Sequence, residues 1–139
     1  MGVWGPGLFD NDYALDWLGE IGRGDSIGPV RRVLEDARTA ENLMTHEAME
    51  VVAAAALVLA ALGYPTDGLP PEARTLALAL KGSVSISTAT LAVLALTNIT
   101  SGEPDIYQGW LMDTSLDQFV LRVDELKQGL LDCAIKLGL

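Results

Sequence analysis

The first twelve residues hold the side chains whose types and spacing come nearest to a binding site. Asp10, Asn11 and Asp12 stand in a row, and all three carry oxygen donors of the kind that Ca²⁺ binds in proteins. Their spacing differs from that of an EF-hand loop, and no glutamate follows at the distance of a bidentate ligand. The three glycines before them would suit a phosphate loop, but a phosphate also needs positive charge and no Lys or Arg precedes Arg23. We therefore expect no metal and no cofactor at this stretch.

A structural role explains the same residues. Asp10 is a good N-cap for the helix that follows, and Phe9 stands before the cap at the spacing of a hydrophobic staple to Ala14. Asp12 falls in the first turn, where the helix dipole favours negative charge, and Trp4 supplies apolar surface that would hold the segment on the fold. The alternative that stays open is a partner-binding surface anchored by Trp4 and Phe9.

Glu50 is the second candidate for a binding role. It opens a helical stripe whose other members, Ala54, Leu57 and Ala61, are apolar. A carboxylate at the edge of a buried helix needs hydrogen-bond donors. We expect backbone N–H groups of residues 2–7 to supply them. The candidate binding residues are Trp4, Phe9, Asp10, Asn11, Asp12 and Glu50.

The sequence contains few of the residues and motifs that form catalytic sites. His46 is the single histidine, and its i,i+4 pairing with Glu50 lacks the second histidine that a zincin motif requires. No G-x-S-x-G stretch is present. Cys133 falls on the apolar seam of the last expected helix, which indicates an inert core thiol. We predict no catalytic residue.

The elements that must position these side chains are all helices. The apolar spacing predicts an all-α fold, a compact single domain of residues 1–139 built as a bundle of six or seven helices. The run from Val51 to Leu62 is apolar throughout, which predicts a central helix touched by several others. The expected helices are residues 11–21, 26–39, 46–62, from Pro70 or Pro71 to Gly82, 85–98 and 115–137, with a short one within 101–113.

Two of these helices carry further expectations. The serines and threonines of residues 85–98 also fit a strand, but no partner strand is visible elsewhere in the sequence. On the helix of residues 26–39, Arg31 with Glu35 and Arg32 with Asp36 are i,i+4 pairs on the expected solvent side.

Composition narrows the class of partner. The 139 residues carry a formal net charge of −10, which disfavours nucleic acid and anionic membranes and would attract a basic protein or a cationic ligand. The longest apolar run, residues 51–64, is too short to span a bilayer, and no signal peptide is visible. One cysteine allows no intramolecular disulfide. We expect a cytoplasmic protein, and a homo-oligomer is compatible with the sequence.

The opening stretch also resembles a known family. "MGVWGPGLFDNDYALDWLGEI" is similar to the start of bacterial proteins of the domain of unknown function 4259 family, which begin M-G-x-W-G-x-G-x-F-x-N-D. The resemblance continues at "EAMEVVAAAALVLAALGYP" and more weakly at "IYQGWLMD". It implies a small, mainly helical domain and no particular activity.

Two functions from different classes remain as hypotheses. The first is a non-enzymatic accessory or immunity-type module that binds another protein, favoured by small size, acidity and the lack of a catalytic motif. The second is a small enzyme or ligand sensor with an acidic pocket formed by Asp10, Asp12 and Glu50.

Overall fold

The computed structural model describes residues 12–21, 27–39, 45–63, 69–101 and 114–138. Over these residues the chain forms six α-helices and no strand, so the all-α bundle predicted from the sequence is confirmed. Residues 102–113, which were expected to hold a short helix, lie outside the described residues. The helices are α1 (Asp12–Ile21), α2 (Ile27–Thr39), α3 (Thr45–Ala61), α4 (Pro71–Leu80), α5 (Ile86–Ser101) and α6 (Thr114–Gly138).

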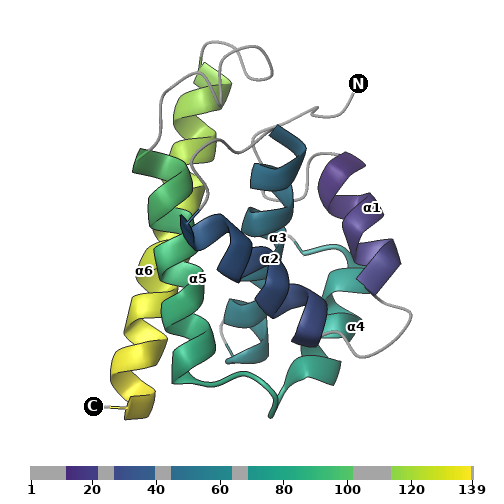
Figure 1. Cartoon of the computed structure of the whole chain (residues 1–139), viewed down its shortest axis with the longest axis vertical. Coiled ribbons are helices and arrows are strands. Elements are labelled where there is room, and N and C mark those ends of the chain that lie inside the picture. Colours follow the sequence, from purple (N-terminus) through teal and green to yellow (C-terminus); the bar gives the residue numbers. More distant parts are fainter. Residues whose placement is uncertain (1–11, 22–26, 40–44, 64–68, 102–113, 139) are drawn as a thin grey trace.

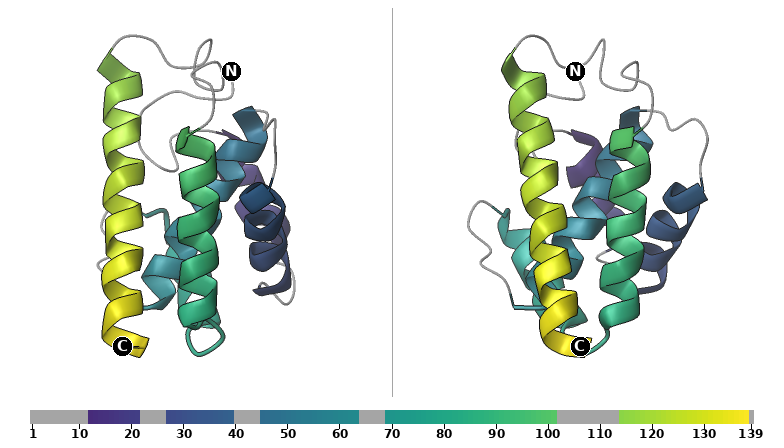
Figure 2. Two further views of the ribbon diagram at one scale, coloured as in Figure 1. Left: turned by 60° about the vertical axis from the view of Figure 1, so that its left-hand side comes forward. Right: turned by 90° about the vertical axis from the view of Figure 1, so that its left-hand side faces the viewer.

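The helices are arranged around α3 (Figure 1). This helix contacts each of the other five, as its uninterrupted apolar sequence predicts. α5 and α6 lie side by side and run in opposite directions, and α2 crosses in front of α3 and α5 (Figures 1 and 2). α1 packs against α3 on the side away from α6.

Small side chains make the crowded centre possible. Every residue of α3 from Val51 to Val58 is buried, and four of these eight residues are consecutive alanines, from Ala53 to Ala56. A methyl side chain lets a neighbouring helix approach closely without leaving a void. None of the described helices is both long enough and apolar enough to cross a membrane.

Two glycines end helices where the sequence indicates a stop. Gly63 after α3 and Gly82 after α4 have φ values of 101° and 95°, the left-handed region that favours glycine. The Gly63 N–H donates to the Ala60 carbonyl at 3.0 Å, which satisfies one of the last acceptors of α3. α4 begins with Pro71 in its first turn, where the missing N–H costs nothing.

Residues 86–101 form a helix, so the strand alternative is wrong. Ser85 precedes the first turn, and its N–H donates to the Thr88 hydroxyl at 3.3 Å, the backward half of a capping box. The Ala89 N–H bonds the Ser85 carbonyl at 3.0 Å and so starts the helical ladder. The hydroxyls that lower the helix propensity of this segment therefore help to begin the helix.

Polar contacts fix α2 on α5. The Arg31 Nη1 donates to the Thr88 hydroxyl at 3.2 Å, and its Nη2 lies 3.5 Å from the Glu35 carboxylate, which confirms the expected i,i+4 pair. Near the other end of α5, the Asn98 side-chain amide donates to the Ala37 carbonyl at 2.7 Å. That carbonyl is one of the last four of α2, and these four carbonyls accept no hydrogen bond from an N–H of the helix itself.

Candidate functional site

The structure tests the predicted binding residues unevenly. Trp4, Phe9, Asp10 and Asn11 lie outside the described residues, as does the predicted contact of Glu50 with residues 2–7. Asp12 is the first residue of α1, but its side chain is not among those described. Glu50 is half-buried in α3 and lies on the wall of a cavity.

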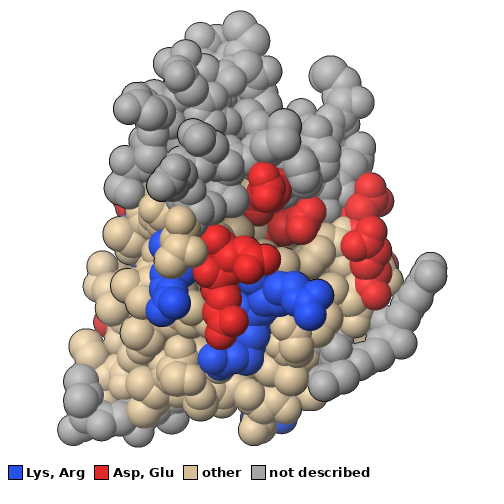
Figure 3. All heavy atoms as spheres, in the orientation of Figure 1, with Lys and Arg blue, Asp and Glu red and all other residues tan. Residues whose placement is uncertain are grey.

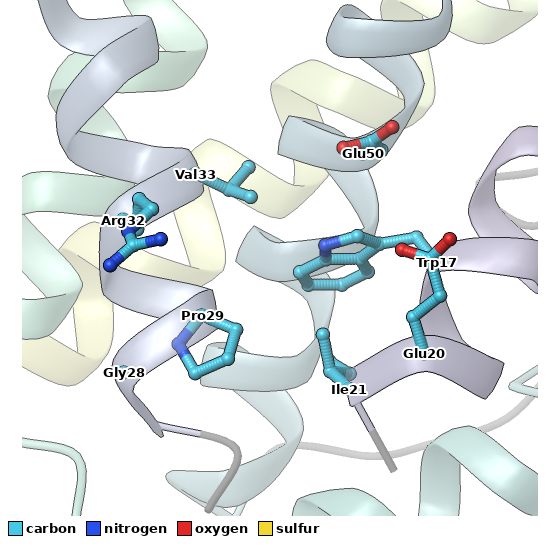
Figure 4. A pocket seen from close by; sticks show the side chains of 8 residues that line it. All are labelled: Trp17, Glu20, Ile21, Gly28, Pro29, Arg32, Val33 and Glu50. Carbon is cyan, nitrogen blue, oxygen red and sulfur yellow. The ribbon is translucent and has the colours of Figure 1, made fainter. Parts of the chain in front are cut away.

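This cavity is open to solvent, lies between α1, α2 and α3, and has a volume of about 490 Å³. Small-molecule sites in proteins commonly measure about 300–1,000 Å³. Figure 4 shows that its side chains come from all three helices. They are Trp17, Glu20, Ile21, Gly28, Pro29, Arg32, Val33 and Glu50.

Apolar side chains form most of its inner surface. Trp17 and Ile21 lie on the buried stripe of α1, four residues apart, and the Trp17 side chain is only 5% exposed. The Trp17 indole lies across the middle of the cavity, with Pro29 and Val33 of α2 facing it (Figure 4). The cavity therefore presents an aromatic face that the core holds in place.

Charged groups stand on opposite sides of this indole. Arg32 belongs to α2, Glu20 to α1 and Glu50 to α3. Figure 4 shows the guanidinium at the left of the Trp17 indole, the Glu20 carboxylate at its right and the Glu50 carboxylate above it. The cavity beside Glu50 thus carries both signs of charge, whereas the acidic pocket expected from Asp10, Asp12 and Glu50 stays a prediction, because the side chains of Asp10 and Asp12 lie outside those described. The expected Arg32–Asp36 pair is wrong, since among the described residues no ion pair joins Arg32 to a carboxylate.

The same face of the molecule is charged more widely. Figure 3 shows acidic side chains along α1 at the right of the view and a mixed group of acidic and basic side chains over α2 in the middle. Among the residues of α1 whose burial is described, Asp16 and Glu20 are exposed acids one helical turn apart. The surface around the cavity would therefore attract ligands that carry a positive group.

A second hollow, of about 380 Å³, lies between α2 and α5. Arg31, Glu35 and Arg38 form its α2 side, and Ser87, Thr90, Leu91 and Leu94 form its α5 side. Arg31 is already bonded to Thr88 and Glu35, so this hollow is in part a by-product of the contacts that fix the two helices.

Cys133 is buried in α6, which confirms the predicted core thiol. Burial raises the pKa of this thiol above its ordinary value; Lys136 nearby opposes that rise and Asp132 adds to it. A thiol with a raised pKa is a weak nucleophile at neutral pH. Among the described residues, no three His, Cys, Asp or Glu side chains lie close enough together to hold a metal ion.

Sequence reasoning found Glu50 but missed the rest of the cavity. The sequence predicted that Trp17 lies on the buried stripe of its helix and that Arg32 faces solvent on another. Both predictions are correct for each helix taken alone. The signal that the sequence lacked is the crossing of α1 and α2 over α3, which brings these side chains together.

Comparisons with known proteins give a family and no activity. The model of a domain of unknown function, DUF4259, matches residues 2–120, which is most of the chain. Searches of curated proteins and of solved structures find no match.

Proposed function

This chain belongs to the DUF4259 family of domains of unknown function, and we propose that it works as a non-enzymatic, cytoplasmic accessory module that binds another protein, as immunity proteins do. Its partner is a basic protein, and neither nucleic acid nor a membrane is a target. Membership of the family supports the helical domain but brings no function with it, so the proposal depends on the surface of the molecule.

The observation that carries the proposal is the outer face of α6. Leu121, Leu131 and Ile135 are exposed there, with exposed fractions of 61%, 39% and 58%. The spacing from Leu121 to Ile135 is 14 residues, close to four helical turns, and Leu131 lies one turn from Ile135. α6 packs on α5 and α3 and stands at the edge of the molecule (Figure 2), so this face is open to a partner.

Charge indicates what kind of partner fits this face. Over residues 121–136 of α6 the acids Asp124, Glu125 and Asp132 are balanced by Arg122, Lys127 and Lys136, so this stretch has no net charge of its own. The chain as a whole carries a net charge of −10, which would speed association with a basic protein and slow it with an acidic one. The preference for a basic partner therefore comes from the charge of the whole chain, and the exposed leucine and isoleucine side chains of α6 would pack against apolar side chains on that partner's surface.

Affinity capture from the native host, with variants, tests the proposal. The bait is the wild-type chain, the double variant Leu131→Ser/Ile135→Ser, or the control Leu78→Ser. Leu78 lies on α4 and is 73% exposed, so the control removes a leucine elsewhere on the surface that is more exposed than Leu131 or Ile135. A protein that is captured is then purified, and its direct binding is measured at two salt concentrations.

We expect a basic protein that binds the wild type and the control, binds the double variant about tenfold or more weakly, and loses affinity as salt rises. If purified partners bind the double variant as tightly as the wild type, the α6 face is not the docking surface. Size-exclusion chromatography with light scattering checks the other occupant: a dimer that the double variant dissociates would show that a second copy of the chain covers α6.

A ligand sensor is the second candidate function, and one observation favours it. Glu50, selected from the sequence for a binding role, lies on the wall of a cavity that also contains the Trp17 indole. The cavity supplies charge, apolar surface and an aromatic face, which are the groups of a binding site. Its lining residues all fall within the part of the chain that the family model matches, whereas Leu121, Leu131 and Ile135 lie beyond it.

A further inference from the structure

We propose that the cavity between α1, α2 and α3 binds a zwitterionic small molecule with an apolar side chain, of the amino acid or short-peptide class. This inference rests on the ligand-sensor candidate and is independent of protein binding at α6. It follows from three features of the cavity: the placement of its charges, its apolar surface and its size.

The charges are separated by the indole of Trp17. Arg32 on α2 offers a guanidinium, which is suited to a carboxylate because it can donate two parallel hydrogen bonds. Glu20, across the indole from Arg32, and Glu50, above the indole in Figure 4, offer carboxylates to an ammonium group. A ligand whose two charged ends have opposite signs would satisfy both sides at once.

The carboxylate of Glu50 need not be unpaired for this role. An ionised carboxylate has two oxygens and about four lone-pair sites, so it can accept from a ligand as well as from the protein. Glu20 is exposed and lies at the cavity edge, where an entering ammonium group would meet it. The face of Trp17 adds a cation–π attraction for an ammonium group placed over it.

The apolar surface and the volume define the remainder of the ligand. Ile21, Pro29 and Val33 complete an apolar lining around Trp17, which would remove a hydrocarbon side chain from water. A cavity of about 490 Å³ holds more than a single ion and falls within the size range of small-molecule sites.

Other ligand classes fit less well. Phosphates and other simple anions would meet two carboxylates beside one guanidinium, which is a net repulsive site. A simple organic cation would pair with Glu20 and Glu50. It would also bring a positive charge towards Arg32 and offer that guanidinium no anionic group. With a zwitterion, every charged residue of the cavity can pair with a ligand group of opposite charge.

The experiment titrates the full-length chain with L-leucine, L-phenylalanine and the dipeptide L-leucyl-L-leucine. The readout is the NMR signal of the Trp17 indole N–H, assigned by its loss in Trp17→Phe. The tightest of the three probes is then compared with its C-terminal amide, which lacks the carboxylate, and with its deaminated acid, which lacks the ammonium group. Each is titrated into wild type, Arg32→Gln and Glu20→Gln, and into the control Asp36→Asn, an exposed acid of α2 outside the cavity.

We expect the zwitterion to shift the Trp17 signal and to bind Arg32→Gln and Glu20→Gln about tenfold or more weakly than wild type. The amide should bind wild type and Arg32→Gln equally, because the group that Arg32 contacts is gone. The deaminated acid should likewise be insensitive to Glu20→Gln. Asp36→Asn should bind every probe as wild type does.

Three results would overturn the inference. The first is that no zwitterion shifts the Trp17 signal at millimolar concentration. The second is that the amide or the acid binds as tightly as the zwitterion, which would make the ligand a cation or an anion and leave the sensor function standing without the zwitterion. The third is that Arg32→Gln and Glu20→Gln bind the zwitterion as wild type does. None of these results affects protein binding at α6, which the Leu131→Ser/Ile135→Ser variant tests separately.

Discussion

The hydroxyl of Thr88 is a small group that connects two helices. It is 1% exposed, and it accepts from Arg31 Nη1 at 3.2 Å and from the Ser85 N–H at 3.3 Å. One oxygen atom therefore serves the start of α5 and the contact between α5 and α2. Removing it would take this acceptor away from the half-buried Arg31 guanidinium and from the Ser85 N–H.

We expect Thr88→Val to lower the free energy of unfolding by about 0.5–1.5 kcal/mol, since valine keeps the shape and loses the hydroxyl. Thr88→Ser should cost much less, because its hydroxyl can still accept. Thr90→Val removes a hydroxyl from an exposed position of the same helix and serves as the control. Denaturant unfolding measures all three, and equal midpoints for Thr88→Val and Thr90→Val would contradict this role.

Cys133 gives a prediction about reactivity. Because burial raises its pKa, the thiol stays protonated in the folded chain at pH values where an exposed thiol begins to ionise. The stability that this contributes is fully present below the ordinary thiol pKa, and it is lost as the pH rises from there through the raised pKa of the folded chain.

At mildly alkaline pH, we expect a disulfide reagent to modify native Cys133 roughly 100-fold or more slowly than the unfolded chain, because an opening that costs about 3 kcal/mol must come first. The measurement is the release of the reagent's chromophore, with the chain in guanidinium as the reference for an accessible thiol. Equal rates in the two states would show that the thiol is accessible in the fold.

At the scale of the helix, the interior of α3 depends on small side chains. Ala54 is fully buried on a helix that contacts all five others, so a longer side chain has no space to occupy. We expect Ala54→Leu to lower the free energy of unfolding by about 1–3 kcal/mol through overpacking.

Ala79→Leu is the matched control, because it makes the same change at an exposed position of α4. Leucine and alanine have similar helix propensities, so the control should unfold with nearly the wild-type midpoint. If Ala54→Leu is as stable as Ala79→Leu, α3 is less tightly surrounded than its burial indicates.

The helices were predictable because their signals are local. The stripe of α1 and the glycines at 63 and 82 each lie within a few residues of the feature they determine, and α1 and α3 begin within one residue of their predicted starts. For α5, propensity alone would have allowed a strand. Its packing against α2, α3 and α6 and the cap at Ser85 decide for the helix, and only the cap is a local signal.

The cavity could not be predicted in the same way. Glu50 stood out because an acid among apolar residues is unusual on any helix. Trp17 and Arg32 are ordinary members of their own helices, and they become a site only because α1 and α2 cross α3 at particular angles. Crossing angles depend on how side-chain ridges fit together over a whole interface, and no short stretch of sequence encodes them.

At the scale of the whole molecule, charge is the dominant property. A net charge of −10 on 139 residues produces self-repulsion in the folded state. Salt screens this repulsion, since the Debye length falls from about 30 Å at 0.01 M to about 10 Å at 0.1 M. We expect the melting temperature to rise over this range of sodium chloride concentration.

The double variant Asp16→Asn/Asp124→Asn provides the comparison, because it removes two exposed negative charges. Its melting temperature should depend less on salt than that of the wild type. A wild-type melting temperature that falls as salt is added would show that specific ion pairs outweigh the net repulsion.

The central position of α3 has a consequence for how the molecule opens. A peripheral helix can detach from its neighbours and exchange its amide hydrogens with solvent while the remainder stays folded. α3 has no such route, because it contacts helices from both halves of the chain and its residues 51–58 are all buried. Its amides should exchange only when the whole chain unfolds. The exchange rate of the Val52 to Val58 amides would then report the global free energy of unfolding in water, without any denaturant.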